Sequence, residues 1–201
     1  MLLSHTFKCV FVHIPRTGGS WLTYKIRDAD QNLKGTGKEV ALIHAHPRRY
    51  EYVRTGRHGT LQQIYDLADV DLDDYFKFAI SRHPYTRFQS CYKYYTAKTA
   101  TSARAGFVNE HQMMDWLERS GAQKNHVMPQ SRWYDERLDH VFKFEDIHRI
   151  NVSKYIPGMS EFNKRSNPII KTTYDHELHW GLKERIYKFY KDDFDLFGYQ
   201  P

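Results

Sequence analysis

The chain lacks several features that would assign it to a special class of protein. Two cysteines among 201 residues, Cys9 and Cys91, are too few for a disulfide framework or a four-cysteine zinc site. No apolar run approaches the roughly 20 residues that a membrane helix needs. A signal peptide is also absent from the pattern, since residues 1–4 lead almost directly into the first expected strand. With no repeat and no Pro/Gly-rich linker, the sequence predicts a cytoplasmic protein with a single domain over residues 1–201.

Acidic residues are fewer than basic ones. The chain has 24 Asp and Glu against 30 Lys and Arg, a formal net charge of +6. Such a balance indicates a polyanionic partner, which could be a nucleic acid, a phosphorylated cofactor or an acidic polysaccharide. The basic residues are scattered and do not form one run, so charge alone does not choose among these partners.

Apolar runs typical of strands alternate with patterns typical of helices. The alternation predicts an α/β domain with a largely parallel central sheet flanked by helices. Ligands of such sheets bind at the carboxyl ends of the strands. The expected strands are residues 10–12, 40–43, 75–81 and 140–144, and the expected helices are residues 20–28, 60–68, 84–97, 107–119 and 175–191.

Residues 11–21, FVHIPRTGGSW, place a glycine-rich turn between the first strand and a helix. Adjacent glycines allow the backbone to approach a ligand closely, and a helix start directs unpaired N–H groups at an anion. An arginine adds a full charge and hydroxyl groups add donors. The turn therefore predicts a phosphate-sized anion site. It lacks both the lysine of the Walker pattern and the spacing G-x-G-x-x-G, which disfavours an ordinary ATP- or GTP-binding loop. The residues concerned are Arg16, Thr17, Gly18, Gly19 and Ser20.

A second basic turn follows a second strand, in residues 78–92, FAISRHPYTRFQSCY. Arg82 leaves the strand end, and Arg87 and Ser90 share a helix face at positions i and i+3. Arginine with a hydroxyl group can clamp a dianionic phosphate through charge-assisted hydrogen bonds. A capped helix with surface arginines is the alternative. Two clamps at successive strand ends predict a ligand with phosphates at two separated positions.

The two turns resemble motifs of the sulfotransferases that use 3′-phosphoadenosine 5′-phosphosulfate (PAPS), especially the carbohydrate-type branch that includes heparan sulfate and chondroitin sulfotransferases. HIPRTGGS resembles their 5′-phosphosulfate loop, usually written HIPKTGGT. SRHPYTRFQSCY resembles their 3′-phosphate motif, R-x-P-x-x-R-F-x-S-x-Y. Shorter similarities follow in the same order at residues 129–134 (PQSRWY), 141–147, 163–166 and 187–199.

The resemblance implies a P-loop-like, three-layer α/β fold and transfer of a sulfuryl group from PAPS to a hydroxyl or amine, with a carbohydrate as the first candidate acceptor. The product would be the bisphosphate PAP, and no metal is expected. By position, Arg82 and Ser90 would hold the 3′-phosphate, with Arg87 in a supporting role. Arg16 stands where the family has lysine and would offset charge on the leaving oxygen. The residues expected to wrap the 5′-phosphosulfate are Pro15, Arg16, Thr17, Gly18, Gly19, Ser20 and Trp21.

Transfer to an alcohol benefits from a general base, and histidine titrates in the useful range. Related enzymes have a catalytic His or Glu near the segment IHAHPRR, which makes His44 and His46 the candidates. His46 ranks first because it directly precedes Pro47, where the chain must leave the sheet. A metal site at this pair is disfavoured by the absence of a third ligand at a convincing spacing. His13 is expected to orient the backbone.

Two functions of other classes stay open at this point. One is a kinase-like nucleotide enzyme on the same architecture, and the other is a non-catalytic protein that binds a polyanion. No recognised nucleic-acid-binding module and no membrane segment is evident in the sequence. The acceptor could be a glycan, a peptide tyrosine, a lipid or a small alcohol, and neither the regiochemistry nor the oligomeric state follows from the sequence.

Overall fold

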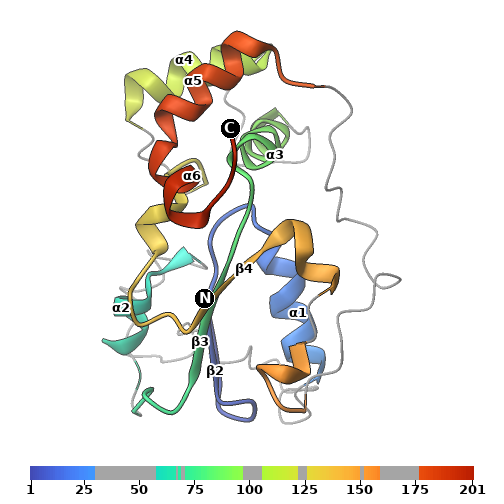
Figure 1. Cartoon of the computed structure of the whole chain (residues 1–201), viewed down its shortest axis with the longest axis vertical. Helices are drawn as coiled ribbons and strands as arrows, with labels where there is room; N and C mark the ends of the chain where they lie inside the picture. The colour runs from blue at the N-terminus through green and yellow to red at the C-terminus, as the bar shows by residue number, and fades with distance from the viewer. Residues whose placement is uncertain are drawn as a thin grey trace.

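A four-stranded sheet forms the centre of the fold (Figure 1). The computed structural model describes residues 1–29, 58–66, 68, 71–96, 106–121, 126–149, 152–158 and 177–201. The strands lie in the order β1-β2-β3-β4, with β2, β3 and β4 parallel and β1 antiparallel to β2. Their bounds are β1 Leu2–Ser4, β2 Cys9–Val12, β3 Phe76–Ser81 and β4 His140–Lys143.

Helices cover both faces of this sheet and gather beyond the carboxyl ends of its strands (Figure 1). Helix α1 lies on one face and α2 on the other, while α3, α4, α5 and α6 lie beyond the strand ends. The helices are α1 Gly19–Ala29, α2 Leu61–Tyr65, α3 Pro84–Thr96, α4 Glu110–Ser120, α5 Trp180–Phe189 and α6 Lys191–Phe197; short 3-10 helices are η3 Gln130–Trp133, η4 Phe144–Arg149 and η5 Val152–Lys154.

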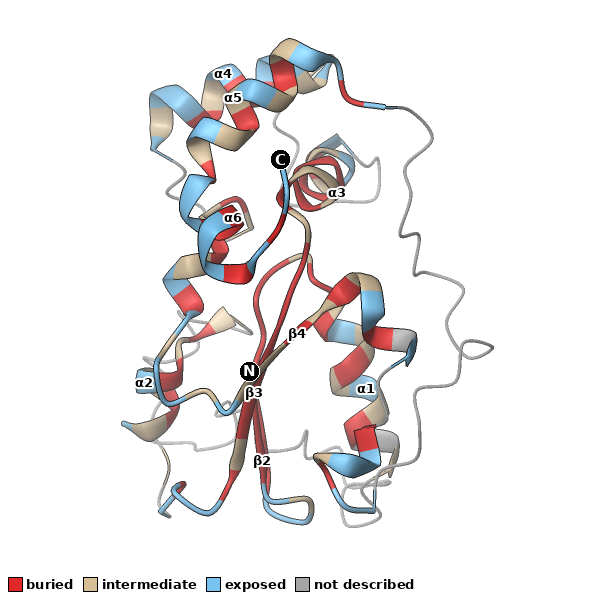
Figure 2. Cartoon of the chain, in the orientation of Figure 1, coloured by how far each residue is buried: buried red, intermediate tan, exposed pale blue. Residues whose placement is uncertain are grey.

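Strand alternation explains why both faces of the sheet are covered. Phe11 and Phe78 pack with Leu22 of α1 on one face. On the other face, Val10 packs with Ile64 of α2. Figure 2 shows β2 and nearly all of β3 as buried, while β4 is mostly of intermediate burial. The central strands are therefore apolar on both sides, as parallel strands between helices must be.

Helices α3, α4, α5 and α6 form a further apolar cluster. Phe88, Cys91 and Tyr95 occupy one face of α3, at the spacing seen in the sequence, and are all buried. They share this cluster with Ile186 of α5. The outward surfaces of α4 and α5 are largely exposed (Figure 2). Helices α4, α5 and α6 therefore pack against α3, the helix that contains Arg87 and Ser90.

The α/β fold with a largely parallel sheet is confirmed, with differences at the ends of elements. Strand β1 was not expected as a strand of the sheet. Helix α4 begins at Glu110 and not at 107, because the side chain of Asn109 accepts a hydrogen bond from the N–H of Gln112 (3.0 Å) and caps the helix. Within the expected helix 175–191, residues 177–179 are not helical, α5 runs from Trp180 to Phe189, and α6 begins at Lys191. The expected strand 40–43 lies outside the described residues.

No helix in the described ranges combines the length and apolar character needed to cross a membrane.

Ile186→Ala should lower the free energy of unfolding by about 2–5 kcal/mol, because Ile186 is fully buried between helices and alanine would leave a cavity. Urea unfolding at neutral pH measures the difference. The matched control is Val108→Ala, whose side chain is 78% exposed and whose effect should stay within about 0.5 kcal/mol. Equal unfolding midpoints for the two variants would contradict the packing of α5.

Candidate functional site

The turn between β2 and α1 adopts backbone conformations that favour glycine. Arg16 has a φ of 68° and Gly18 a φ of 84°, both in the left-handed region. For arginine this region is costly, and such strain is typical of functional turns. The first α1 hydrogen bond runs from the N–H of Leu22 to the carbonyl of Gly18 (3.3 Å). The N–H groups before Leu22 therefore have no carbonyl within the helix to bind, which makes this terminus suitable for an anion.

Both glycines of the turn are in close contact with other parts of the protein. A Cβ at Gly19 would overlap the imidazole ring of His13. At Gly18, a Cβ would lie 2.7 Å from Cε2 of Phe144, the residue that follows β4. Packing within the protein therefore favours glycine at both positions, independently of any ligand. The expected role of His13 in orienting the backbone stays a prediction.

Two arginines of the second turn hold the carbonyl groups of the first. Nη1 of Arg82 donates to the carbonyl of Arg16 (3.2 Å), and Nε of Arg87 donates to the carbonyl of Pro15 (3.0 Å). In a trans peptide the N–H points opposite to the C=O. The N–H groups of Arg16 and Thr17 are therefore directed away from these guanidinium groups.

Arg16 and Ser90 connect the two turns directly. Ser90 Oγ accepts hydrogen bonds from Nε (3.1 Å) and Nη2 (2.9 Å) of Arg16. The same guanidinium lies 5.0 Å from the ring centroid of Tyr94. Arg82 in turn lies 4.3 Å from the ring centroid of Phe144. The structure thus brings together Arg16, Arg82 and Ser90, which the sequence places at two separate anion sites.

Other predicted site residues take different positions. Thr17 is buried and its hydroxyl donates to the carbonyl of Ile14 (2.9 Å), so its proton is used within the turn. Ser20 is exposed at the start of α1, and Trp21 packs against the apolar cluster of the α1 face. The candidate bases His44 and His46 lie outside the described residues.

Gln130 and Asp193 support the second turn and were missed by sequence reasoning. The Gln130 side chain accepts a hydrogen bond from the N–H of Arg82 and donates one to its carbonyl, both at 2.8 Å. Asp193 Oδ2 accepts from the N–H of Gln130 (2.9 Å). The only signals in the sequence were the similarities at residues 129–134 and 187–199, which assign no role to either residue.

His58 lies near the first turn and was also missed by sequence reasoning. Nδ1 of His58 lies 2.9 Å from the carbonyl of His13. Because a carbonyl only accepts, Nδ1 must carry the proton, and the neutral ring then has its basic lone pair on Nε2. The indole of Trp133 donates to the carbonyl of His58 (2.8 Å) and fixes its backbone. Nothing local in the sequence around His58 marks it, since its partners are distant in the chain.

The residues next to Arg82 in the chain are held by Glu145 and Tyr199. Glu145 accepts hydrogen bonds from the N–H of His83 (2.9 Å) and from the hydroxyl of Tyr199 (3.1 Å). The Tyr199 hydroxyl also lies 3.0 Å from Oγ of Ser81. Burial raises the pKa of Tyr199 and lowers the pKa of His83, so both are neutral at physiological pH. The turn is therefore fixed on both sides of Arg82.

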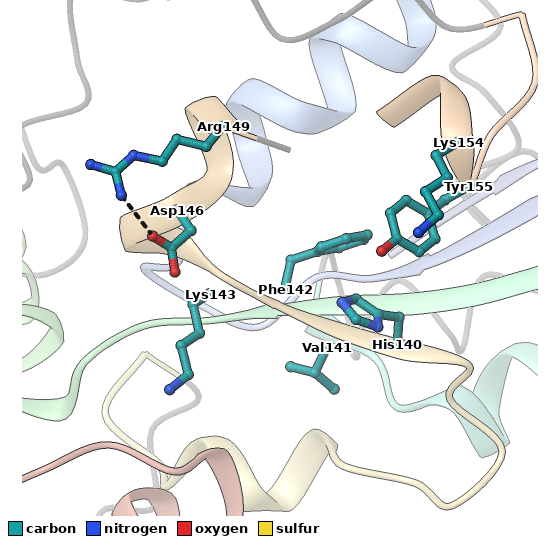
Figure 3. Close-up of a pocket in the computed structure, with 8 residues that line it drawn as sticks. All are labelled: His140, Val141, Phe142, Lys143, Asp146, Arg149, Lys154 and Tyr155. Carbon is teal, nitrogen blue, oxygen red and sulfur yellow. Dashed lines mark ion pairs between the residues drawn. The ribbon is translucent and has the colours of Figure 1, made fainter. Parts of the chain in front are cut away.

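A cavity of about 380 Å³ lies along β4 (Figure 3). His140, Phe142 and Tyr155 gather on one side of it, and Asp146 pairs with Arg149 at 3.9 Å. None of the residues that line the cavity belongs to the two basic turns. The candidate site is therefore located by hydrogen bonding, not by this cavity. Among the described residues, no three His, Cys, Asp or Glu side chains cluster in a way that could hold a metal ion.

Replacing His126 by Phe should flatten the fall in stability at low pH. Burial first, and then Arg16 and Arg87, lower the pKa of His126 to about 4. The unfolded chain binds a proton near pH 6.5 that the folded chain excludes, so this histidine reduces stability as the pH falls from about 6.5 to 4. The ring of phenylalanine can keep the stacking on Tyr94, at 4.6 Å between centroids, without titrating. Urea unfolding at several pH values from 7.5 to 4.5 measures how steeply the free energy of unfolding changes with pH. The same pH dependence in the folded variant as in the wild type would contradict the lowered pKa of His126.

No curated protein and no solved structure matched the chain at a significant level. A sequence model of the sulfotransferase family matches residues 1–200 of the 201, a range that includes both basic turns and the network behind them. Sulfuryl transfer is the reaction of that family, and the chain belongs to the sulfotransferase family.

Proposed function

We propose that the protein transfers a sulfuryl group from PAPS to a hydroxyl or amine acceptor, with a carbohydrate as the first candidate. The observation that carries the proposal is the contact between Arg16 and Ser90, which joins two basic turns at neighbouring strand ends. A nucleotide with anionic groups at both its 5′ and 3′ positions matches this pair of turns. A nucleotide with a 5′ chain alone would use only the first of them.

The donor set fits this cofactor chemically. Residues 15–21 would hold the 5′-phosphosulfate, with the start of α1 supplying N–H groups and Arg16 a charge. Arg82 and Ser90 are each only 5% exposed and would hold the 3′-phosphate. Charged donors in a dry environment bind anions more strongly than they would at the surface. Arg87 supports the site through the backbone, since its guanidinium binds carbonyl groups.

When bound, PAPS supplies a sulfuryl group attached to a phosphate leaving group. Transfer of this kind needs in-line geometry and stabilisation of charge on the leaving oxygen. Arg16 is the candidate for that stabilisation. A general base must accept the proton of the acceptor hydroxyl, and His46, with His44 second, remains the proposed base. His58 is an additional imidazole, located at the turn between β2 and α1, and its bond to the carbonyl of His13 leaves Nε2 as the basic nitrogen.

A kinase-like enzyme and a non-catalytic polyanion-binding protein are the competing functions. The missing Walker lysine and the family match disfavour a kinase. The strained backbone at Arg16 disfavours a passive binding surface, because strain of this kind is typical of sites built for a specific ligand.

PAP should stabilise the protein more than ADP does, because only PAP carries the 3′-phosphate that Arg82 and Ser90 are proposed to bind. At about 100 times its dissociation constant, PAP should add roughly 2.7 kcal/mol, a melting shift of about 5–10 °C for a chain of this length. Thermal unfolding at matched ligand concentrations measures both shifts. Equal shifts would favour a nucleotide enzyme of the kinase type, and no shift with PAP would contradict the proposed cofactor.

His46→Ala should leave PAP affinity unchanged and reduce turnover by about 10² to 10⁴, the usual range for a positioned base. Wild-type turnover should fall at low pH as the imidazole is protonated. The assay is mass spectrometry of a broad acceptor mixture incubated with PAPS, which also identifies the acceptor.

His44→Ala and His58→Ala are the matched controls for this assignment. A folded His46→Ala protein with near wild-type turnover would exclude His46, and loss of turnover in only one of the controls would identify that histidine as the base.

A further inference from the structure

We propose that Gln130 is a positioning residue for the 3′-phosphate, acting through the backbone of Arg82. This inference rests on the proposed function, in which Arg82 binds that phosphate. Strand β3 ends at Ser81, so Arg82 is the first residue beyond the sheet ladder. The side-chain amide of Gln130 binds both its N–H and its C=O at 2.8 Å. Gln130 thus makes with Arg82 the two hydrogen bonds that a further residue of a neighbouring strand would make.

The orientation of this amide is determined by the groups around it. Asp193 Oδ2 lies 3.3 Å from Nε2 of Gln130, and the carbonyl of Arg82 binds the same nitrogen. A carboxylate and a carbonyl can only accept, so Nε2 must face both of them. A flipped amide would place its oxygen against two acceptors and its nitrogen against the N–H of Arg82. Only one orientation of Gln130 therefore satisfies every partner.

The side chain of Gln130 and its two hydrogen bonds to Arg82 form a clamp, and Asp193 holds this clamp in place. Its two oxygens accept from the backbone N–H groups of Gln130 (2.9 Å) and Ser131 (2.8 Å). Asp193 and Gln130 are both fully buried, so water does not compete for these bonds. Helix α6, near the end of the chain, is thereby connected to the turn after β3 through two hydrogen-bonded residues.

The clamp determines where the guanidinium of Arg82 can reach. With the backbone held by Gln130, the side chain is directed by bonds to Thr86 Oγ1 (3.1 Å) and to the carbonyl of Arg16 (3.2 Å). A shift of the Arg82 backbone would change both bonds together with the position offered to a phosphate. Gln130 itself lies behind the turn, bonded to backbone, and this is why we assign it positioning and not catalysis.

The test is Gln130→Met, which keeps the side-chain length and removes both hydrogen bonds to Arg82. Titration calorimetry should show a loss of PAP affinity of about 10-fold, the size expected for one hydrogen bond of positioning, while ADP affinity falls by much less, because ADP has no 3′-phosphate. The readout is the ratio of PAP to ADP affinity, which general destabilisation would not change. Gln62→Met is the matched control, since Gln62 is exposed on α2, and its ratio should equal that of the wild type.

Arg82→Ala and the double variant Arg82→Ala/Gln130→Met separate this inference from the proposed function. If Gln130 acts through Arg82, the double variant should lose no more PAP affinity than Arg82→Ala alone. Additive losses would overturn the inference. If Arg82→Ala loses PAP affinity but Gln130→Met keeps the wild-type ratio, the inference fails and the proposed 3′-phosphate site stands. An unchanged ratio in Arg82→Ala would overturn both.

Gln130→Asn is the milder variant in case Gln130→Met does not fold. Asparagine keeps a neutral amide at this buried position beside Asp193, but its side chain is one methylene shorter and withdraws the amide from the backbone of Arg82. Its ratio of PAP to ADP affinity should fall between those of the wild type and Arg82→Ala. A wild-type ratio in this folded variant would overturn the inference.

Discussion

The guanidinium of Arg87 is enclosed by protein and connects the parts of the chain that surround the two basic turns. Arg87 is 2% exposed and donates to the carbonyls of Pro15 (3.0 Å), His126 (3.3 Å) and Met128 (2.8 Å). Its Nη1 lies 4.0 Å from the carboxylate of Asp193. Removing a charge from water costs several kcal/mol unless its partners are all in place. The first turn, the segment before η3 and helix α6 must therefore assemble together around α3.

Three arginines serve this region in different ways, and their burial and partners distinguish them. Arg87 binds backbone carbonyls and a buried carboxylate, which makes it part of the framework. Arg82 is held at its backbone and binds the first turn with its side chain. Arg16 is partly exposed and reaches across to Ser90. Exposure to solvent thus increases from Arg87 to Arg82 to Arg16. An anionic ligand that comes from solvent can therefore meet the charge of Arg16 first.

Sequence reasoning was strongest where the determining pattern was local. The strands at 10–12 and 75–81, the helix after Pro84 and the turn with two glycines all follow from patterns within a few residues, and the α/β fold is confirmed. The supports of the site were missed because their partners are distant: Gln130 is 48 residues from Arg82, and Asp193 is 63 from Gln130. Periodicity cannot show such bonds. The assignments at His44 and His46 and the single-domain organisation stay predictions.

The close packing of His13 against Gly19 restricts the residues that homologues can have at these two positions. Any side chain at position 19 collides with the imidazole ring, and a smaller residue at position 13 would leave a void beside α1. A mutation at either position alone is therefore unfavourable, while a paired change can preserve the packing. The two positions form one epistatic unit, so a homologue that has a side chain at 19 should have lost the bulky ring at 13.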